Sequence, residues 1–130
     1  MSKQNLAIVK KLYDAAQQGD MDTILSLISP EFVMYEADGL PFAGTYHGSE
    51  GFSQFVEAFA NTWSEFSNTE LEVLDANPYV IGLSKLRATG KRSGETIEVP
   101  LAEFFRVEGD YIVELRPFYF DGAAVARAGR

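Results

Sequence analysis

The sequence predicts an α+β fold in which three helices pack on the concave face of a curved, mixed but mainly antiparallel sheet. Three observations predict it. Helical spacing of apolar residues is confined to residues 3–66, where one strand-like segment interrupts it. Strand-like segments fill residues 69–121, and short turns such as 108–110 separate them, as in hairpins. Helices and strands that are segregated in this way are typical of α+β domains.

The first half of the chain contains the three expected helices. The first, over residues 3–18, is amphipathic, and Gly19-Asp20 ends it and caps the second, over residues 21–28. Gly48 or Ser49 begins a third helix, over roughly residues 50–66. The apolar face of this third helix is aromatic and holds Phe52, Phe55, Phe59, Trp63 and Phe66.

Two acidic residues lie on apolar strand faces. In the expected strand 32–38, Glu36 shares a face with Phe32 and Met34. In the first strand of the last hairpin, Glu103 shares a face with Leu101 and Phe105. An ionisable group on such a face must be paired, hydrogen-bonded or held neutral. Further strands are expected over 69–76, 79–89 and 111–121, the loop 39–48 is expected to be irregular, and the small residues 122–130 are expected to fray.

Composition excludes several classes of function. The 130 residues fit one domain, expected over 1–121 with the short tail 122–130. A net charge of -8 argues against nucleic acids and anionic membranes as partners. The absence of cysteine excludes thiolate chemistry, and a single histidine excludes a multi-histidine metal site within one chain. With no secretory core, spanning segment or phosphate-binding glycine motif, we expect a cytoplasmic protein without a cofactor.

Several short motifs occur in a characteristic order along nearly the whole chain. They are Gly19-Asp20, Tyr46-His47-Gly48, AEFFRV at 102–107 with Gly109, and PFYFD at 117–121. In this order the sequence resembles the SnoaL-like branch of the nuclear transport factor 2 and ketosteroid isomerase superfamily. The resemblance implies a cone-shaped α+β barrel, a pocket between sheet and helices, and a homodimer formed through the sheet. It implies less about the reaction, because this fold hosts isomerases, cyclases, hydrolases, dehydratases and non-catalytic proteins.

The resemblance also assigns positions to the two acids. Glu36 falls where the steroid isomerases keep their aspartate general base, and Glu103 where they keep a protonated acid that donates to the oxyanion. Their first-helix tyrosine matches Leu12 here, and Tyr13 is one residue away, or about 100° around the helix. Both acids are glutamates, so each carboxylate reaches one methylene further. Steroid isomerase activity itself therefore does not follow from the resemblance. The trio of two aspartates and an arginine found in limonene epoxide hydrolases is not recognisable either. The sequence does not determine on which face of its strand Arg87 lies.

We predict an apolar cavity in which Glu103 lies deep with a raised pKa and Glu36 lies nearer the mouth. In this hypothesis Glu36 is the base, while Glu103, helped by Tyr119, donates to a developing oxyanion. The cavity is expected to bind a small apolar molecule. Its predicted walls are Tyr13, Met34, Phe55, Phe59, Trp63, Leu101 and Tyr119.

Other interpretations of these residues stay open. Glu103 can be a structural acid bonded to a tyrosine hydroxyl or a backbone amide, and Glu36 can point to solvent. His47, in a loop before a helix cap, is expected to be exposed or capping. The aromatic stripe of the third helix is first of all core.

Two function classes follow from these alternatives. One is a cofactor-independent proton-transfer enzyme, such as an isomerase, cyclase or dehydratase, acting on a small hydrophobic substrate. The other is a non-catalytic ligand-binding or dimerisation module. In either case we predict a homodimer through the outer face of the sheet. The last strand is expected to present Ile112, Glu114, Arg116, Phe118 and Phe120 on that face.

Overall fold

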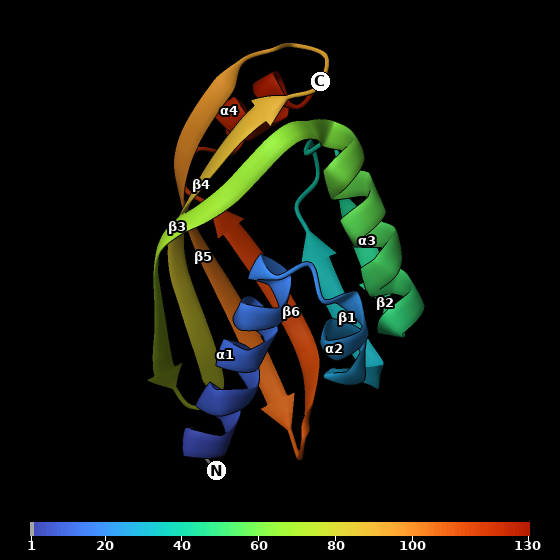
Figure 1. The fold of residues 1–130 in the computed structure, drawn as a ribbon, viewed down its shortest axis with the longest axis vertical. Coiled ribbons are helices and arrows are strands. Elements are labelled where there is room, and N and C mark those ends of the chain that lie inside the picture. The colour runs from blue at the N-terminus through green and yellow to red at the C-terminus, as the bar shows by residue number, and fades with distance from the viewer. Residues whose placement is uncertain (1) are drawn as a thin grey trace.

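The computed structural model describes residues 2–130, which form four helices and six strands (Figure 1). In chain order the elements are α1 (Ser2–Gln17), α2 (Met21–Ser26), β1 (Ile28–Glu36), β2 (Gly44–His47), α3 (Gly48–Thr62), β3 (Trp63–Ala76), β4 (Tyr79–Gly90), β5 (Thr96–Glu108), β6 (Tyr111–Tyr119) and α4 (Gly122–Ala128).

One six-stranded sheet, in the order β2-β1-β6-β5-β4-β3, carries the fold. All neighbouring strands are antiparallel except β1 and β6, which are parallel. The sheet is curved and does not close, and α1, α2 and α3 lie against one of its faces (Figure 1). The predicted α+β class with a mixed, mainly antiparallel sheet is confirmed.

The C-terminal segment 122–130 does not fray as expected but forms α4. Asp121 caps this helix, because its Oδ1 accepts a hydrogen bond from the Ala124 backbone N–H at 3.0 Å. Val125 and Ala128 are fully buried. The small side chains that suggested a loose tail instead allow the helix to pack closely against the end of the sheet.

Two other segments differ from the sequence-based expectation. The third helix ends at Thr62, so Trp63 and Phe66 belong to the long strand β3 rather than to a helical aromatic stripe. Strand pairing explains the change, since Trp63 is opposite Gly90 in the β3–β4 ladder. Part of the expected irregular loop forms β2, which pairs with β1 and covers its outer edge.

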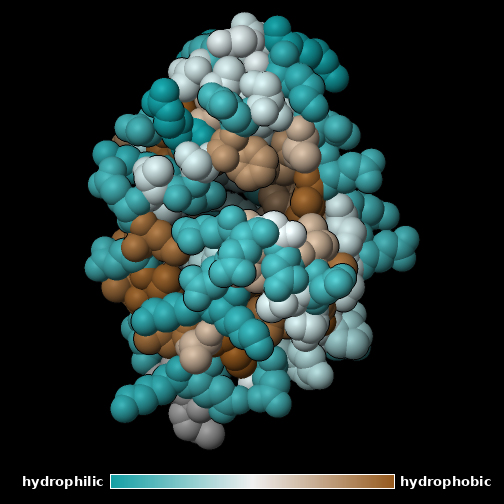
Figure 2. Space-filling view, viewed as in Figure 1, coloured by the Kyte–Doolittle hydropathy of each residue, from teal (hydrophilic) through white to brown (hydrophobic). Residues whose placement is uncertain are grey.

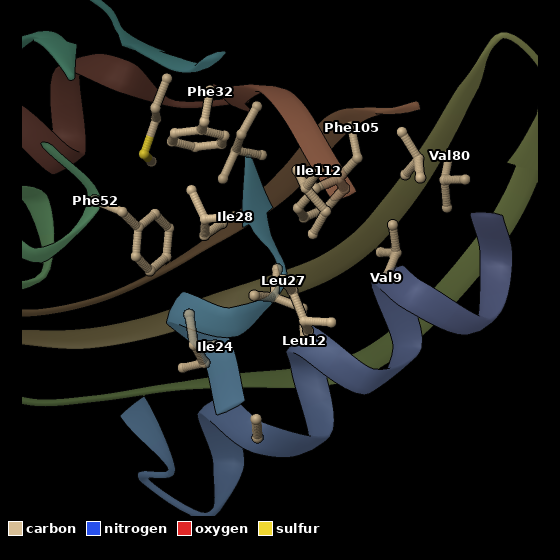
Figure 3. Close-up of a cluster of buried hydrophobic side chains, with 14 residues drawn as sticks. Val9, Leu12, Ile24, Leu27, Ile28, Phe32, Phe52, Val80, Phe105 and Ile112 are labelled. Carbon is tan, nitrogen blue, oxygen red and sulfur yellow. The ribbon is translucent and has the colours of Figure 1, made fainter. Parts of the chain in front are cut away.

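Two clusters of buried apolar side chains hold the elements together. The first joins α1 and α2 to the sheet and includes Val9, Leu12, Phe32 and Ile112 (Figure 3). The second lies toward α4 and includes Leu40, Phe42, Trp63, Leu86, Val99 and Val125. Burial of each large apolar side chain stabilises the folded state by roughly 1.5–3 kcal/mol. The two clusters thereby fix opposite ends of the helix–sheet interface.

Ile112 belongs to this core and not to the outer face on which the strand alternation had placed it. Its side chain is 0% exposed. The reason is a register shift in the β5–β6 ladder, where Arg106 is opposite Glu114 but Val107 is opposite Ile112. The extra residue in β6 places Ile112 on the face opposite to the one that regular alternation from Glu114 would give.

Candidate functional site

A cavity of about 350 Å³ lies between the helices and the concave face of the sheet. Its walls come from all three helices of that face and from five of the strands, and most of the lining side chains are apolar. Figure 2 shows the surface hollowed beside the end of α1, with hydrophobic side chains on the rim. The polar side chains among the described lining residues are Tyr13, Asn68, Glu103 and Tyr119.

The structure brings most of the predicted wall residues together. The cavity lining includes Tyr13, Met34, Phe55, Phe59, Leu101 and Tyr119. Trp63 is outside this lining and belongs to the second core cluster. Its indole ring packs against Phe42 and Phe59, with centroid distances of 6.5 and 6.1 Å. The start of β3 directs it toward the α4 end of the molecule rather than into the cavity.

Glu103 borders the cavity and is hydrogen-bonded to a tyrosine from the opposite wall. The Tyr13 hydroxyl, from α1, donates to Glu103 Oε1 at 2.8 Å. Burial raises the pKa of Glu103 to about 6, and the hydrogen bond from Tyr13 opposes that rise. Burial and the adjacent carboxylate raise the pKa of Tyr13, so its hydroxyl remains a donor at neutral pH. The Tyr13–Glu103 pair therefore places a titratable carboxyl group in an otherwise apolar cavity wall.

Glu36 does not lie at the mouth of this cavity, as expected, but outside its lining, where it borders a more open groove toward α4. Its side chain is 4% exposed, and Tyr119 donates to its Oε2 at 3.0 Å. Its Oε1 has no hydrogen-bond partner within residues 2–130. Burial raises the pKa of Glu36 to about 8, the bond from Tyr119 opposes the rise, and the charge of Glu103 adds to it.

Tyr119, which the sequence-based hypothesis placed beside Glu103, donates to Glu36 instead, and the tyrosine hydroxyl that meets Glu103 is that of Tyr13. Apolar residues of the loop after β1 pack beside Tyr119, the hydrogen-bond partner of Glu36. Leu40 and Phe42 of this loop are buried, and the Phe42 ring packs against Tyr119 at 6.0 Å between centroids. This part of the loop, which was expected to be irregular, therefore belongs to the second core cluster.

The site thus consists of two tyrosine–glutamate hydrogen bonds, one in the wall of the apolar cavity and one that begins at its lining residue Tyr119. The family model described as "SnoaL-like domain" matches residues 9–115. The chain belongs to the SnoaL-like family. The resemblance of the sequence to this family is confirmed.

Solved structures of similar proteins support the same fold for this SnoaL-like domain. An NTF2-like protein from Burkholderia thailandensis E264 is 28% identical, with 97% of each chain covered and a TM-score of 0.88. TerC, co-crystallised with polyporic acid, is 16% identical, with coverage of 96% and 97% and a TM-score of 0.84. A protein from Silicibacter sp. TM1040 with a proposed polyketide cyclase assignment is 14% identical, with coverage of 96% and 95% and a TM-score of 0.79. No curated protein matches the chain.

Two polar residues whose roles the sequence left open, His47 and Arg87, lie outside the cavity lining of this SnoaL-like domain, whereas Asn68 is part of it. His47 precedes α3 without capping it through its side chain, and it is exposed outside the cavity lining. Arg87 is exposed on β4, on the face opposite the buried Leu86. Asn68, which the sequence analysis missed, lines the cavity and donates to Ser84 Oγ at 3.2 Å. It lay in the segment expected to join helix and strand, so no face could be assigned to it.

Among residues 2–130, histidine and acidic side chains nowhere gather in a group of three that could hold a metal ion. No helix in the same range is long and apolar enough to cross a membrane. A second, more open groove of about 650 Å³ lies between the ends of β1 and β6 and α4, and Tyr119 lines both spaces.

Proposed function

We propose that this SnoaL-like domain binds a small, largely apolar molecule in the inner cavity and transfers protons on it without a cofactor. Isomerisation, cyclisation and dehydration are reactions of this class. The observation that carries the proposal is the Tyr13–Glu103 hydrogen bond in the apolar cavity wall. A second lining residue, Tyr119, is hydrogen-bonded in turn to Glu36. A carboxyl group whose pKa lies near the working pH is suited to general acid–base catalysis.

The two acids have different roles in this proposal because their pKa values differ. With a pKa raised to about 6, Glu103 is mostly ionised at pH 7 and is the base that removes a proton from a substrate carbon. With a pKa raised to about 8, Glu36 is mostly protonated. These roles are the reverse of those predicted from the sequence.

Protonated Glu36 also determines what Tyr119 can do. Its O–H can donate to the Tyr119 oxygen, and the Tyr119 O–H is then free to donate to an oxyanion in the cavity. Glu103 finally returns the proton to another substrate atom. Glu103 and Tyr119 are therefore the proposed catalytic residues, and Glu36 acts through Tyr119.

A proton-exchange assay tests this proposal without the natural substrate. 2-Tetralone is a bicyclic ketone of suitable size, and NMR follows the exchange of its α-protons in D₂O. We expect the protein to accelerate exchange, and Glu103→Gln to reduce the acceleration at least about 100-fold. Glu98→Gln, an exposed acid on the same strand, is the control and should change little. Binding of 2-tetralone without any acceleration of exchange would contradict catalysis and favour a binding module.

The outer face of the sheet favours a second, compatible role in dimerisation. Phe118 is 56% exposed and packs edge-to-face on Phe104 at 5.3 Å between centroids. Arg106 and Arg116 flank this region, and both form ion pairs with Glu114. Apolar area bordered by paired charges supports the proposal of a homodimer through this face. A cytoplasmic location likewise remains a prediction.

A further inference from the structure

Gly82 lies directly beside the Tyr13–Glu103 hydrogen bond. It is buried on β4, and its Cα partner on β5 is Glu103. A Cβ atom built on Gly82 would lie 2.0 Å from the Tyr13 hydroxyl oxygen and 2.7 Å from Tyr13 Cζ. Both distances are far below van der Waals contact, so no other residue fits at this position while Tyr13 remains in place.

Backbone conformation does not account for a glycine here. Gly19 and Gly109 have positive φ angles, which favour glycine, but Gly82 is in a regular strand ladder without one. Glycine in a strand interior is unfavourable, and it often marks a place where another group approaches the backbone closely. The group that approaches is the phenol ring of Tyr13.

We infer that Gly82 is a positioning residue: its missing side chain leaves the space in which the Tyr13 hydroxyl reaches Glu103. Tyr13 extends from α1 across the cavity to the sheet and needs this space to bring its oxygen within 2.8 Å of Glu103. A methyl group at position 82 would displace the hydroxyl by on the order of 1 Å, enough to break a hydrogen bond of ordinary length. The relevance to catalysis rests on the proposed function, whereas the positioning itself does not.

The experiment measures the pKa of Glu103 directly, by ¹³C NMR of its carboxyl group during a pH titration. The Tyr13 hydrogen bond lowers the pKa of Glu103. Gly82→Ala should therefore raise that pKa, in the same direction as Tyr13→Phe, and adding Gly82→Ala to Tyr13→Phe should raise it little further. Gly122→Ala is the matched control, because a Cβ there meets no atom within 4 Å. A folded Gly82→Ala protein in which Glu103 titrates as in wild type would overturn the inference.

A second variant keeps the test decisive if Gly82→Ala does not fold. Tyr13→Leu removes the ring that a Cβ at position 82 would strike, so Tyr13→Leu/Gly82→Ala should fold and melt close to Tyr13→Leu alone. If the double variant is also unfolded, Gly82 is needed for another reason and the inference is wrong. The 2-tetralone assay separates positioning by Gly82 from the proposed catalysis. A raised Glu103 pKa in Gly82→Ala supports positioning even if neither the wild type nor any variant accelerates proton exchange.

Discussion

The carboxyl group of Glu36 lies among apolar side chains, with one oxygen bonded to Tyr119 and the other without a partner in residues 2–130. Its pKa is raised from 4.5 to about 8 by burial. Between these values the folded protein holds a proton that the unfolded chain releases. The free energy of unfolding therefore falls as pH rises through this window, and the loss is complete above the folded pKa.

Glu36→Gln should remove this loss, because glutamine has nearly the same shape and does not ionise. We expect the variant to be more stable than wild type by on the order of a few kcal/mol at pH 8, since each pKa unit corresponds to about 1.4 kcal/mol. At pH 4 the two proteins should have similar stability. Urea unfolding at both pH values measures the difference, and an equal difference at pH 4 and pH 8 would show that Glu36 is not held neutral by the fold.

Residue by residue, the sequence located both acids but not their partners. Alternation along the strands was enough to place Glu36 and Glu103 on inward faces. Each acid is hydrogen-bonded to a tyrosine that is far away in the sequence. Tyr13 and Glu103 are separated by 90 positions, and Glu36 and Tyr119 by 83. Local periodicity carries no information on such contacts.

At the scale of elements, periodicity predicted the long helices and strands and failed where pairing overrides it. Thr62 ends α3 because Trp63 joins the β3–β4 ladder, and the bulge beside Val107 moves Ile112 into the core. A bulge has no clear signature in a single sequence. α4 was missed because a short helix is stabilised by tertiary packing more than by its own propensity.

The cap of α4 gives a prediction for this element. Asp121→Ala removes the acceptor of the Ala124 N–H and should lower the free energy of unfolding by about 1 kcal/mol. Asp121→Asn is the matched control, because asparagine caps helices about equally well. Denaturant unfolding of both variants makes the measurement. A fraying tail would make both substitutions neutral, which is the outcome that argues against a stably docked α4.

The whole molecule has one face of its sheet covered by helices and the other free of them (Figure 1). On the free face the rings of Tyr79, Phe104 and Phe118 form a row across β4, β5 and β6, with centroid distances of 5.9 and 5.3 Å. Phe120, just beyond β6, is 85% exposed. Exposed aromatic residues in one patch are typical of interaction surfaces, and a second copy of the chain would offer the same patch in return.

We therefore expect light scattering at micromolar concentration to give about twice the chain mass of 14.4 kDa. Phe118→Lys places a charge in the centre of the patch and should shift the protein to the monomer, because an unpaired charge is costly to bury. Gln17→Lys adds the same charge on α1, on the helix side of the sheet, and should leave the dimer intact. The monomer mass for the wild type, or equal masses for the two variants, would contradict a dimer through this face. Retained helix and strand content in both variants, measured by circular dichroism, ensures that a change in mass reports on association rather than on unfolding.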